Sequence, residues 1–114
     1  MKTVTTSLLL LLALSGCSDA SRTNSRETVP QLWSDHKQLS VQIDVCATKG
    51  EEALTSLGFT GVVRNGAFSY GNLNGNRAAV KCVDVPGGSF VYFSVAGANK
   101  EAVEKLRNEI AHKF

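Results

Sequence analysis

The chain has 114 residues, of which 43% are apolar and 19% charged, and twelve basic and ten acidic side chains give it a formal net charge of +2. These are ordinary values for a globular protein. They exclude a multidomain enzyme, a collagen-like or disordered chain and a polybasic nucleic-acid-binding protein. They do not exclude attachment to a membrane, because the apolar residues are unevenly distributed along the chain.

The N-terminus carries a short apolar segment. Lys2 supplies a positive charge, and residues 8–14 form an uninterrupted apolar run. A run of that length rises about 10 Å as a helix, whereas the hydrocarbon core of a bilayer is about 30 Å thick. The segment therefore has the size of a signal-peptide core and is too short to span a membrane.

The apolar run ends in the residues Leu14-Ser15-Gly16-Cys17. This motif resembles the lipobox of bacterial lipoproteins, in which a branched apolar residue and two small residues precede the cysteine that receives lipid. The resemblance implies that residues 1–16 are removed as a signal peptide, that Cys17 carries a thioether-linked diacylglycerol, and that its new amine carries a third acyl chain. Two or more acyl chains anchor a protein stably to a membrane surface. The alternative is an ordinary secretory signal that leaves Cys17 as a free thiol.

The residues after Cys17 bear on which membrane holds the protein. In enterobacterial lipoproteins an Asp directly after the lipidated cysteine resembles an inner-membrane retention signal. Ser18 stands there instead, which favours the outer membrane, facing the periplasm. Asp19 comes one place later and leaves the inner membrane open.

The chain beyond Cys17 divides into a tether and a folded unit. Residues 18–28 contain a single apolar side chain, so they bury too little surface to offset the entropy of ordering. We therefore expect a flexible tether over residues 17–38, with a short turn of helix within residues 30–38. The folded domain is expected to cover residues 39–114.

The first elements of that domain are a strand and a helix. Apolar residues alternate with polar ones over residues 39–45, which is the period of a half-buried strand. Thr48 and Glu51 fit a capping box at the start of a helix. Gly58 is placed to end that helix in a left-handed conformation, with Phe59 packing back on its last turn.

Strand signals fill the middle of the domain. A strand is expected over residues 62–70, with a bulge at Asn65-Gly66. Asn74-Gly75 is the strongest hairpin signal in the chain, because both residues accept positive φ. Further strands are expected over residues 77–85 and 89–96, in which Val91, Phe93 and Val95 share one face.

The last element is a helix capped by Asn99. Its apolar stripe comprises Val103, Leu106, Ile110 and Phe114. The predicted order is β-α-β-β-β-α, which indicates an α+β two-layer sandwich, a four-stranded sheet with two helices on one face.

The same region carries a recurrent pattern of small and apolar residues. Its members are Cys46, Ala53, Leu54, Leu57-Gly58-Phe59, Gly71, Ala79-Val80 and Cys82. With the element order, this pattern is similar to small exported bacterial domains of unknown function. The resemblance implies no activity.

The cysteines divide into one for lipid and two for the domain. Cys46 and Cys82 are expected to form a structural disulfide in an oxidising compartment. A redox pair or a cysteine nucleophile is the alternative. No Cys-x-x-Cys spacing is present, and the two histidines, His36 and His112, fall in the tether region and in the last helical turn.

Metal and cofactor chemistry receives no support from the sequence. The cysteines and histidines lack zinc-ligand spacing, no phosphate-binding loop is present, and no neighbouring acidic pair suggests glycoside hydrolysis. We therefore expect no metal, no cofactor and no catalytic residues.

Two surfaces remain as candidates for binding. Tyr70, Asn72, Asn74 and Arg77 gather around the second hairpin, although asparagine there also suits turn geometry. The second candidate is the sheet face that the helices leave open, carrying some of Phe68, Tyr70, Phe90 and Tyr92.

These features predict a bacterial envelope lipoprotein that acts as a non-catalytic binding or adaptor module. Its expected partners are membrane lipid, through acylated Cys17, and an envelope protein, with no nucleic acid. One alternative is an inhibitor or immunity-type lipoprotein that neutralises an exported toxin or hydrolase. A less favoured alternative is an envelope hydrolase whose site assembles only in the fold.

Overall fold

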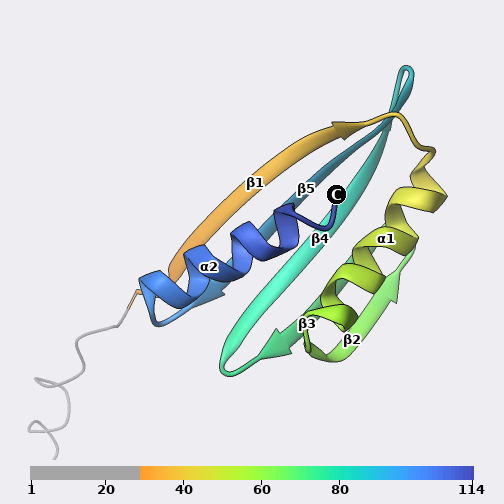
Figure 1. Cartoon of the computed structure of the whole chain (residues 1–114). Coiled ribbons are helices and arrows are strands. Elements are labelled where there is room, and N and C mark those ends of the chain that lie inside the picture. The colour runs from red at the N-terminus through yellow and green to blue at the C-terminus, as the bar shows by residue number, and fades with distance from the viewer. Residues whose placement is uncertain (1–28) are drawn as a thin grey trace, which may run out of the picture.

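A computed structural model describes residues 29–114. The predicted signal peptide, the lipidation site Cys17 and residues 18–28 of the tether lie outside this range. The described part is a five-stranded antiparallel sheet in the order β1-β5-β4-β3-β2, with both helices against the same face (Figure 1). The elements are β1 (Gln31–Leu39), α1 (Ile43–Ser56), β2 (Thr60–Asn65), β3 (Phe68–Leu73), β4 (Asn76–Val85), β5 (Gly88–Gly97) and α2 (Lys100–Ala111).

The prediction of a four-stranded sheet in the order β-α-β-β-β-α was wrong. The observed order is β-α-β-β-β-β-α, because a turn at Gly66-Ala67 divides the strand expected over residues 62–70 into β2 and β3. The first strand is also displaced: residues 31–39, most of which were assigned to the tether and to a short turn of helix, form an edge strand paired with β5. Two charged side chains on the inward side of β1 hide its alternation. Asp35 accepts a hydrogen bond from the His36 amide at 2.8 Å, and Lys37 donates to the Ala111 carbonyl at 2.7 Å, at the end of α2. Both inward-facing charged side chains thus have hydrogen-bond partners, and Lys37 links β1 to the end of α2.

Helix α1 begins five residues before the capping box expected at Thr48. Gln42 precedes its first residue, and the Thr48 hydroxyl donates to the Asp44 carbonyl at 3.0 Å from within the helix. The alternation that suggested a strand over residues 39–45 is therefore shared between the end of β1 and the start of α1. The apolar side of the helix consists of Ile43, Cys46, Ala47, Gly50, Ala53, Leu54 and Leu57.

The end of α1 follows the prediction closely. Gly58 has a φ of 92°, and its amide donates to the Thr55 carbonyl at 3.1 Å. The Phe59 amide donates to the Leu54 carbonyl, also at 3.1 Å. This pair of bonds is the Schellman motif. Phe59 is buried and turns the chain back towards the sheet.

The strand expected over residues 62–70 is two strands. Gly66, with a φ of 61°, and Ala67 form a two-residue turn that pairs Asn65 with Phe68. The glycine therefore makes a hairpin where a bulge was predicted. The bulge of this pair lies earlier, between Thr60 and Val63.

The remaining elements agree with their predicted positions. Asn74 and Gly75, with φ values of 49° and 78°, form the β3–β4 turn. The Asn99 side chain accepts a hydrogen bond from the Ala102 amide at 3.0 Å and so caps α2. Phe114 stacks on Phe93 with the ring centroids 6.0 Å apart.

The hydrophobic core lies between the sheet and the helix layer. It comprises Cys46, Leu54, Phe59, Ala78, Val80, Cys82, Val91, Phe93, Val95, Val103, Leu106 and Ile110. Every strand residue in this group lies on the side of the sheet that the helices cover. The opposite side of the sheet contributes none of these residues.

Candidate functional site: the open face of the sheet

One face of the sheet has no helix over it, and we call it the open face. It is defined by alternation along the paired strands, because successive side chains point to opposite sides. Its members are Leu32, Ser34, His36, Gln38, Thr60, Val63, Asn65, Phe68, Tyr70, Asn72, Arg77, Ala79, Lys81, Val83, Val85, Phe90, Tyr92, Ser94 and Ala96.

Large apolar and aromatic side chains gather on the open face. Leu32 is 70% exposed, Tyr92 44%, Val63 43% and Val83 42%. His36 stacks on Phe90 with the ring centroids 5.3 Å apart, so the histidine adds a ring to the group. The open face therefore exposes rings and methyl groups to solvent, although one solvent-facing side is common in antiparallel sheets.

Charge is divided unevenly between the two sides of the sheet. Of the ten acidic side chains in the chain, Asp19 and Glu27 lie outside the described range, which leaves eight within residues 29–114. These eight are Asp35, Asp44, Glu51, Glu52, Asp84, Glu101, Glu104 and Glu109. Six lie in the two helices, and the other two occupy strand positions on the helix side of the sheet. Within residues 29–114 the open face thus carries the cations Arg77 and Lys81 and no carboxylate.

Three of the four residues predicted as a binding surface come together on the open face. Asn72 and Arg77 are cross-strand partners, and the Arg77 Nε donates to the Asn72 Oδ1 at 3.0 Å. The Arg77 guanidinium also lies 5.7 Å from the centre of the Tyr70 ring. Asn74 does not join them, because it sits in the β3–β4 turn and lines a hollow on the other side of the sheet.

Ala79 stands at the centre of this group. Its cross-strand partners are Tyr70 on β3 and Ser94 on β5. Arg77 and Lys81 precede and follow it on the same face of β4. A small side chain is therefore surrounded by two cations, a phenol and a hydroxyl. The sequence alone did not place Ala79 or Lys81 at a binding surface, because their neighbours come from strands whose register was unknown.

The hollow beside Asn74 is a cavity of about 450 Å³ between the β3–β4 turn and α2. Its polar groups mostly serve the fold. The buried Asn76 side chain donates to the Leu73 and Asn74 carbonyls at 3.0 and 3.3 Å, and Lys105 pairs with Glu109 at 3.8 Å. We therefore regard this cavity as the weaker candidate.

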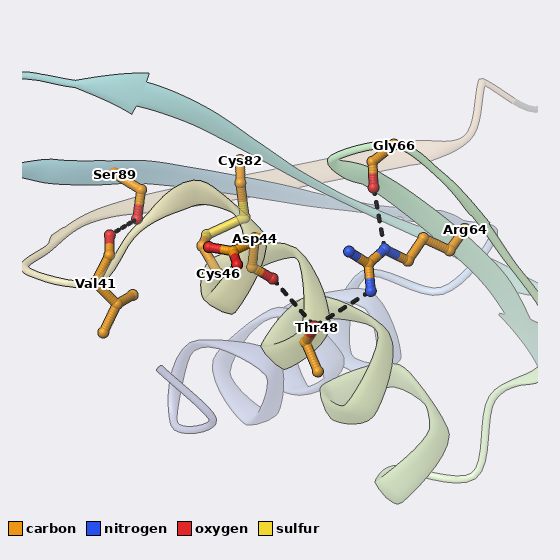
Figure 2. Close-up of a disulfide and its surroundings, with 8 residues drawn as sticks. All are labelled: Val41, Asp44, Cys46, Thr48, Arg64, Gly66, Cys82 and Ser89. Atoms are coloured by element: carbon orange, nitrogen blue, oxygen red, sulfur yellow. Dashed lines mark hydrogen bonds between the residues drawn. A yellow bond between two sulfur atoms is a disulfide. The ribbon is translucent and has the colours of Figure 1, made fainter.

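The expected disulfide between Cys46 and Cys82 is confirmed (Figure 2). It joins α1 to β4, and both residues are buried in the core. In the same region Arg64 donates from Nε to the Gly66 carbonyl at 3.0 Å and from a terminal nitrogen to the Thr48 hydroxyl at 3.2 Å. These contacts hold the outer hairpin against α1.

A cysteine nucleophile would need a nearby base, and neither histidine supplies one beside Cys46 or Cys82. His36 lies on the open face, on β1, and His112 lies at the end of α2. Across residues 29–114 no three His, Cys, Asp or Glu side chains come together in a way that could hold a metal ion. Within the same range, no helix combines the length and apolar character needed to cross a membrane.

Comparison with known proteins adds no assignment. The sequence matches no protein-family model, and neither curated proteins nor solved structures show significant similarity to it.

Proposed function

We propose that this protein is a lipid-anchored, non-catalytic binding module of the bacterial envelope, and that the open face is its binding surface. The acyl chains on Cys17 hold the protein at the membrane, on the periplasmic side of the outer membrane. Residues 18–30 connect that anchor to β1, which begins at Gln31. A flexible tether of this length would have a root-mean-square reach of about 20 Å, which would let the domain meet components close to the membrane surface.

The observation that carries the proposal is the contrast between the two faces of the sheet. One face is closed by helices over a disulfide-linked core, whereas the other presents rings, two cations and no acidic group within the described residues. Because Leu32 and Tyr92 are exposed to water, their side chains add little burial free energy to the isolated domain. An occupant that covers the open face would bury both side chains.

In-cell crosslinking tests this use of the open face. A photoreactive benzoylphenylalanine replaces Tyr92 in the native chain, and a matched variant carries the same group at Lys49, an exposed position on α1. We expect Tyr92 to yield a defined adduct with an envelope component and Lys49 to yield none. Equal labelling from both positions, or none from Tyr92, would contradict the assignment of the open face.

A further inference from the structure

We infer that the array centred on Ala79 binds a carboxylated sugar, as a unit of an acidic glycan. This rests on the proposed function, because it names the ligand class of the same open face. The residues that carry it are Ala79, its two flanking cations Arg77 and Lys81, and the cross-strand neighbours Tyr70 and Ser94.

The strand register places Ala79 at the centre of the array. Residues two apart on a strand lie about 7 Å from each other on the same face, so Arg77 and Lys81 stand on either side of the alanine methyl group. Tyr70 and Ser94 close the other two sides, one strand away in each direction. A ring laid over Ala79 therefore meets a cation at each end, a phenol on one side and a hydroxyl on the other.

The charges around Ala79 favour the binding of an anion to the array. The structure gives Arg77 an amide partner, Asn72, and a ring, Tyr70, while Lys81 is exposed. Neither cation has an acidic partner among residues 29–114, where the ion pairs are Arg64–Glu51 and Lys105–Glu109. A bound carboxylate would thus receive charge-assisted hydrogen bonds from groups not already neutralised.

The polar and aromatic groups suit a pyranose. Its hydroxyls can bond to the Ser94 hydroxyl and the Asn72 amide, both of which donate and accept. Its C–H groups can contact the Tyr70 ring, whose centroid lies 5.7 Å from the Arg77 guanidinium and 5.6 Å from the centroid of the Phe68 ring. Amides, hydroxyls and rings within one array match a ligand that alternates apolar and polar surfaces over a few ångströms.

Other occupants fit the open face less well. A protein interface has an apolar centre with a polar rim, whereas here Ala79 and Ser94 form the centre and Leu32 and Val83 lie towards the margins. A second copy of this chain, bound through the same face, would bring two more cations and no carboxylate from its residues 29–114. A bilayer would need a contiguous apolar patch to insert, and Arg77 and Lys81 interrupt the one present.

The proposed compartment holds a polymer of this kind. The bacterial cell-wall glycan alternates N-acetylglucosamine with N-acetylmuramic acid, and the second sugar is the first with a lactyl ether that ends in a carboxyl group. That carboxyl is amide-linked to a peptide in the intact wall, so the free carboxylate is present on strands from which the peptide has been removed. The two monosaccharides therefore form a matched pair of probes. They differ in the anionic group that the Ala79 array is inferred to recognise.

The test uses the mature acylated protein, isotope-labelled, in a detergent without sugar groups. We expect N-acetylmuramic acid, and more strongly peptide-free glycan strands, to shift the amide signals of residues 77–81 and 92–94. N-acetylglucosamine should bind at least about tenfold more weakly, since it lacks the charged acceptor. Shifts of equal size with both sugars, or shifts confined to the cavity beside α2, would overturn the inference.

Charge reversal supplies the matched control. Lys81→Glu should weaken binding by about tenfold or more, whereas Lys49→Glu on α1, with the same change in net charge, should alter it by less than about twofold. Ala79→Leu places a larger side chain at the centre of the array without altering its charge, and it should also reduce binding of the sugar. Folding of each variant is read from the same spectra. Equal effects of the two lysine variants would contradict the inference.

The outcome also separates this inference from the proposed function. If anionic phospholipid vesicles, and not the sugars, shift the open-face signals, the ligand class is wrong and the open face is still a binding surface. The same holds if Tyr92 crosslinks to an envelope protein while both sugars leave the spectra unchanged.

Discussion

Removal of the disulfide is the perturbation whose effect the structure defines best. The bond joins residues 36 apart in sequence, so it closes a loop of 37 residues in the unfolded chain. The loop-entropy relation gives such a closure about 4 kcal/mol of stabilisation. A domain of this size has a total stability of about 4–13 kcal/mol. Loss of the bond therefore removes a large fraction of the free energy of unfolding.

We expect Cys46→Ala/Cys82→Ala to lower the free energy of unfolding by about 4 kcal/mol. The melting temperature should fall by about 15–30 °C, since each kcal/mol corresponds to roughly 4–8 °C in a domain of this size. The assay is urea unfolding followed by circular dichroism. The dependence on urea should steepen, because the unfolded chain without its crosslink exposes more surface.

Two controls accompany this measurement. Reducing agent should destabilise the wild type to a similar extent and leave the alanine pair unchanged. A difference of less than about 1 kcal/mol between wild type and the alanine pair would refute the reasoning, because it would mean that the loop constraint is offset elsewhere.

Three further substitutions test particular contacts. Asn99→Ala removes the cap of α2 and should lower stability by about 1 kcal/mol in urea unfolding. Gly50→Ala places a methyl group 2.9 Å from Val80 Cγ1. We expect the free energy of unfolding to fall by about 1 kcal/mol, because the steric cost exceeds the gain in helix propensity. A double-mutant cycle with Val80→Ala should show that this loss is relieved. Lys37→Met removes the charged donor to the Ala111 carbonyl and should cost about 1 kcal/mol.

Each of these substitutions has its own control. Asn108→Ala, on the exposed side of the same helix, should change stability much less than Asn99→Ala, and an equal effect would argue against the cap. Additive losses in the cycle of Gly50→Ala with Val80→Ala would show that the two side chains do not compete for space. Lys113→Met is the control for Lys37→Met, since Lys113 is an exposed lysine near the same helix end.

The features that sequence reasoning predicted correctly depend on local chemistry. Gly58 and Asn74-Gly75 need positive φ, and Asn99 caps a helix three residues before the amide that it binds. The Cys46–Cys82 pairing followed because Cys17 falls in the predicted lipobox, which leaves one pair of cysteines for a disulfide. In each case the residues that decide the structure lie close together in sequence or form a pair with no competitor.

The features that were missed depend on tertiary partners. β1 was overlooked because Asp35 and Lys37 take inward positions that look unfavourable for a strand. The Lys37 contact with Ala111 joins residues 74 apart in sequence, and no local sequence pattern indicates it. A strand also appeared to continue through Gly66, because an Asn-Gly pair fits both a bulge and a hairpin.

The candidate site was recoverable in part. Tyr70, Asn72 and Arg77 stand close to one hairpin, so their grouping could be expected from the turn alone. The role given to Ala79 and Lys81 required the register of β3, β4 and β5. His36 required β1, because it joins the open face only once residues 31–39 are known to be a strand.

The measurement that tests the account most directly is fractionation of cells with intact-mass analysis of the native protein, comparing the wild type with Cys17→Ser. We expect the wild type in the outer-membrane fraction with the mass of a diacylated or triacylated chain beginning at Cys17, and loss of both the lipid mass and the membrane association in the variant. A soluble, unmodified wild-type protein cleaved near Ser18 would contradict the proposed anchor, and the tethered binding module would then be wrong.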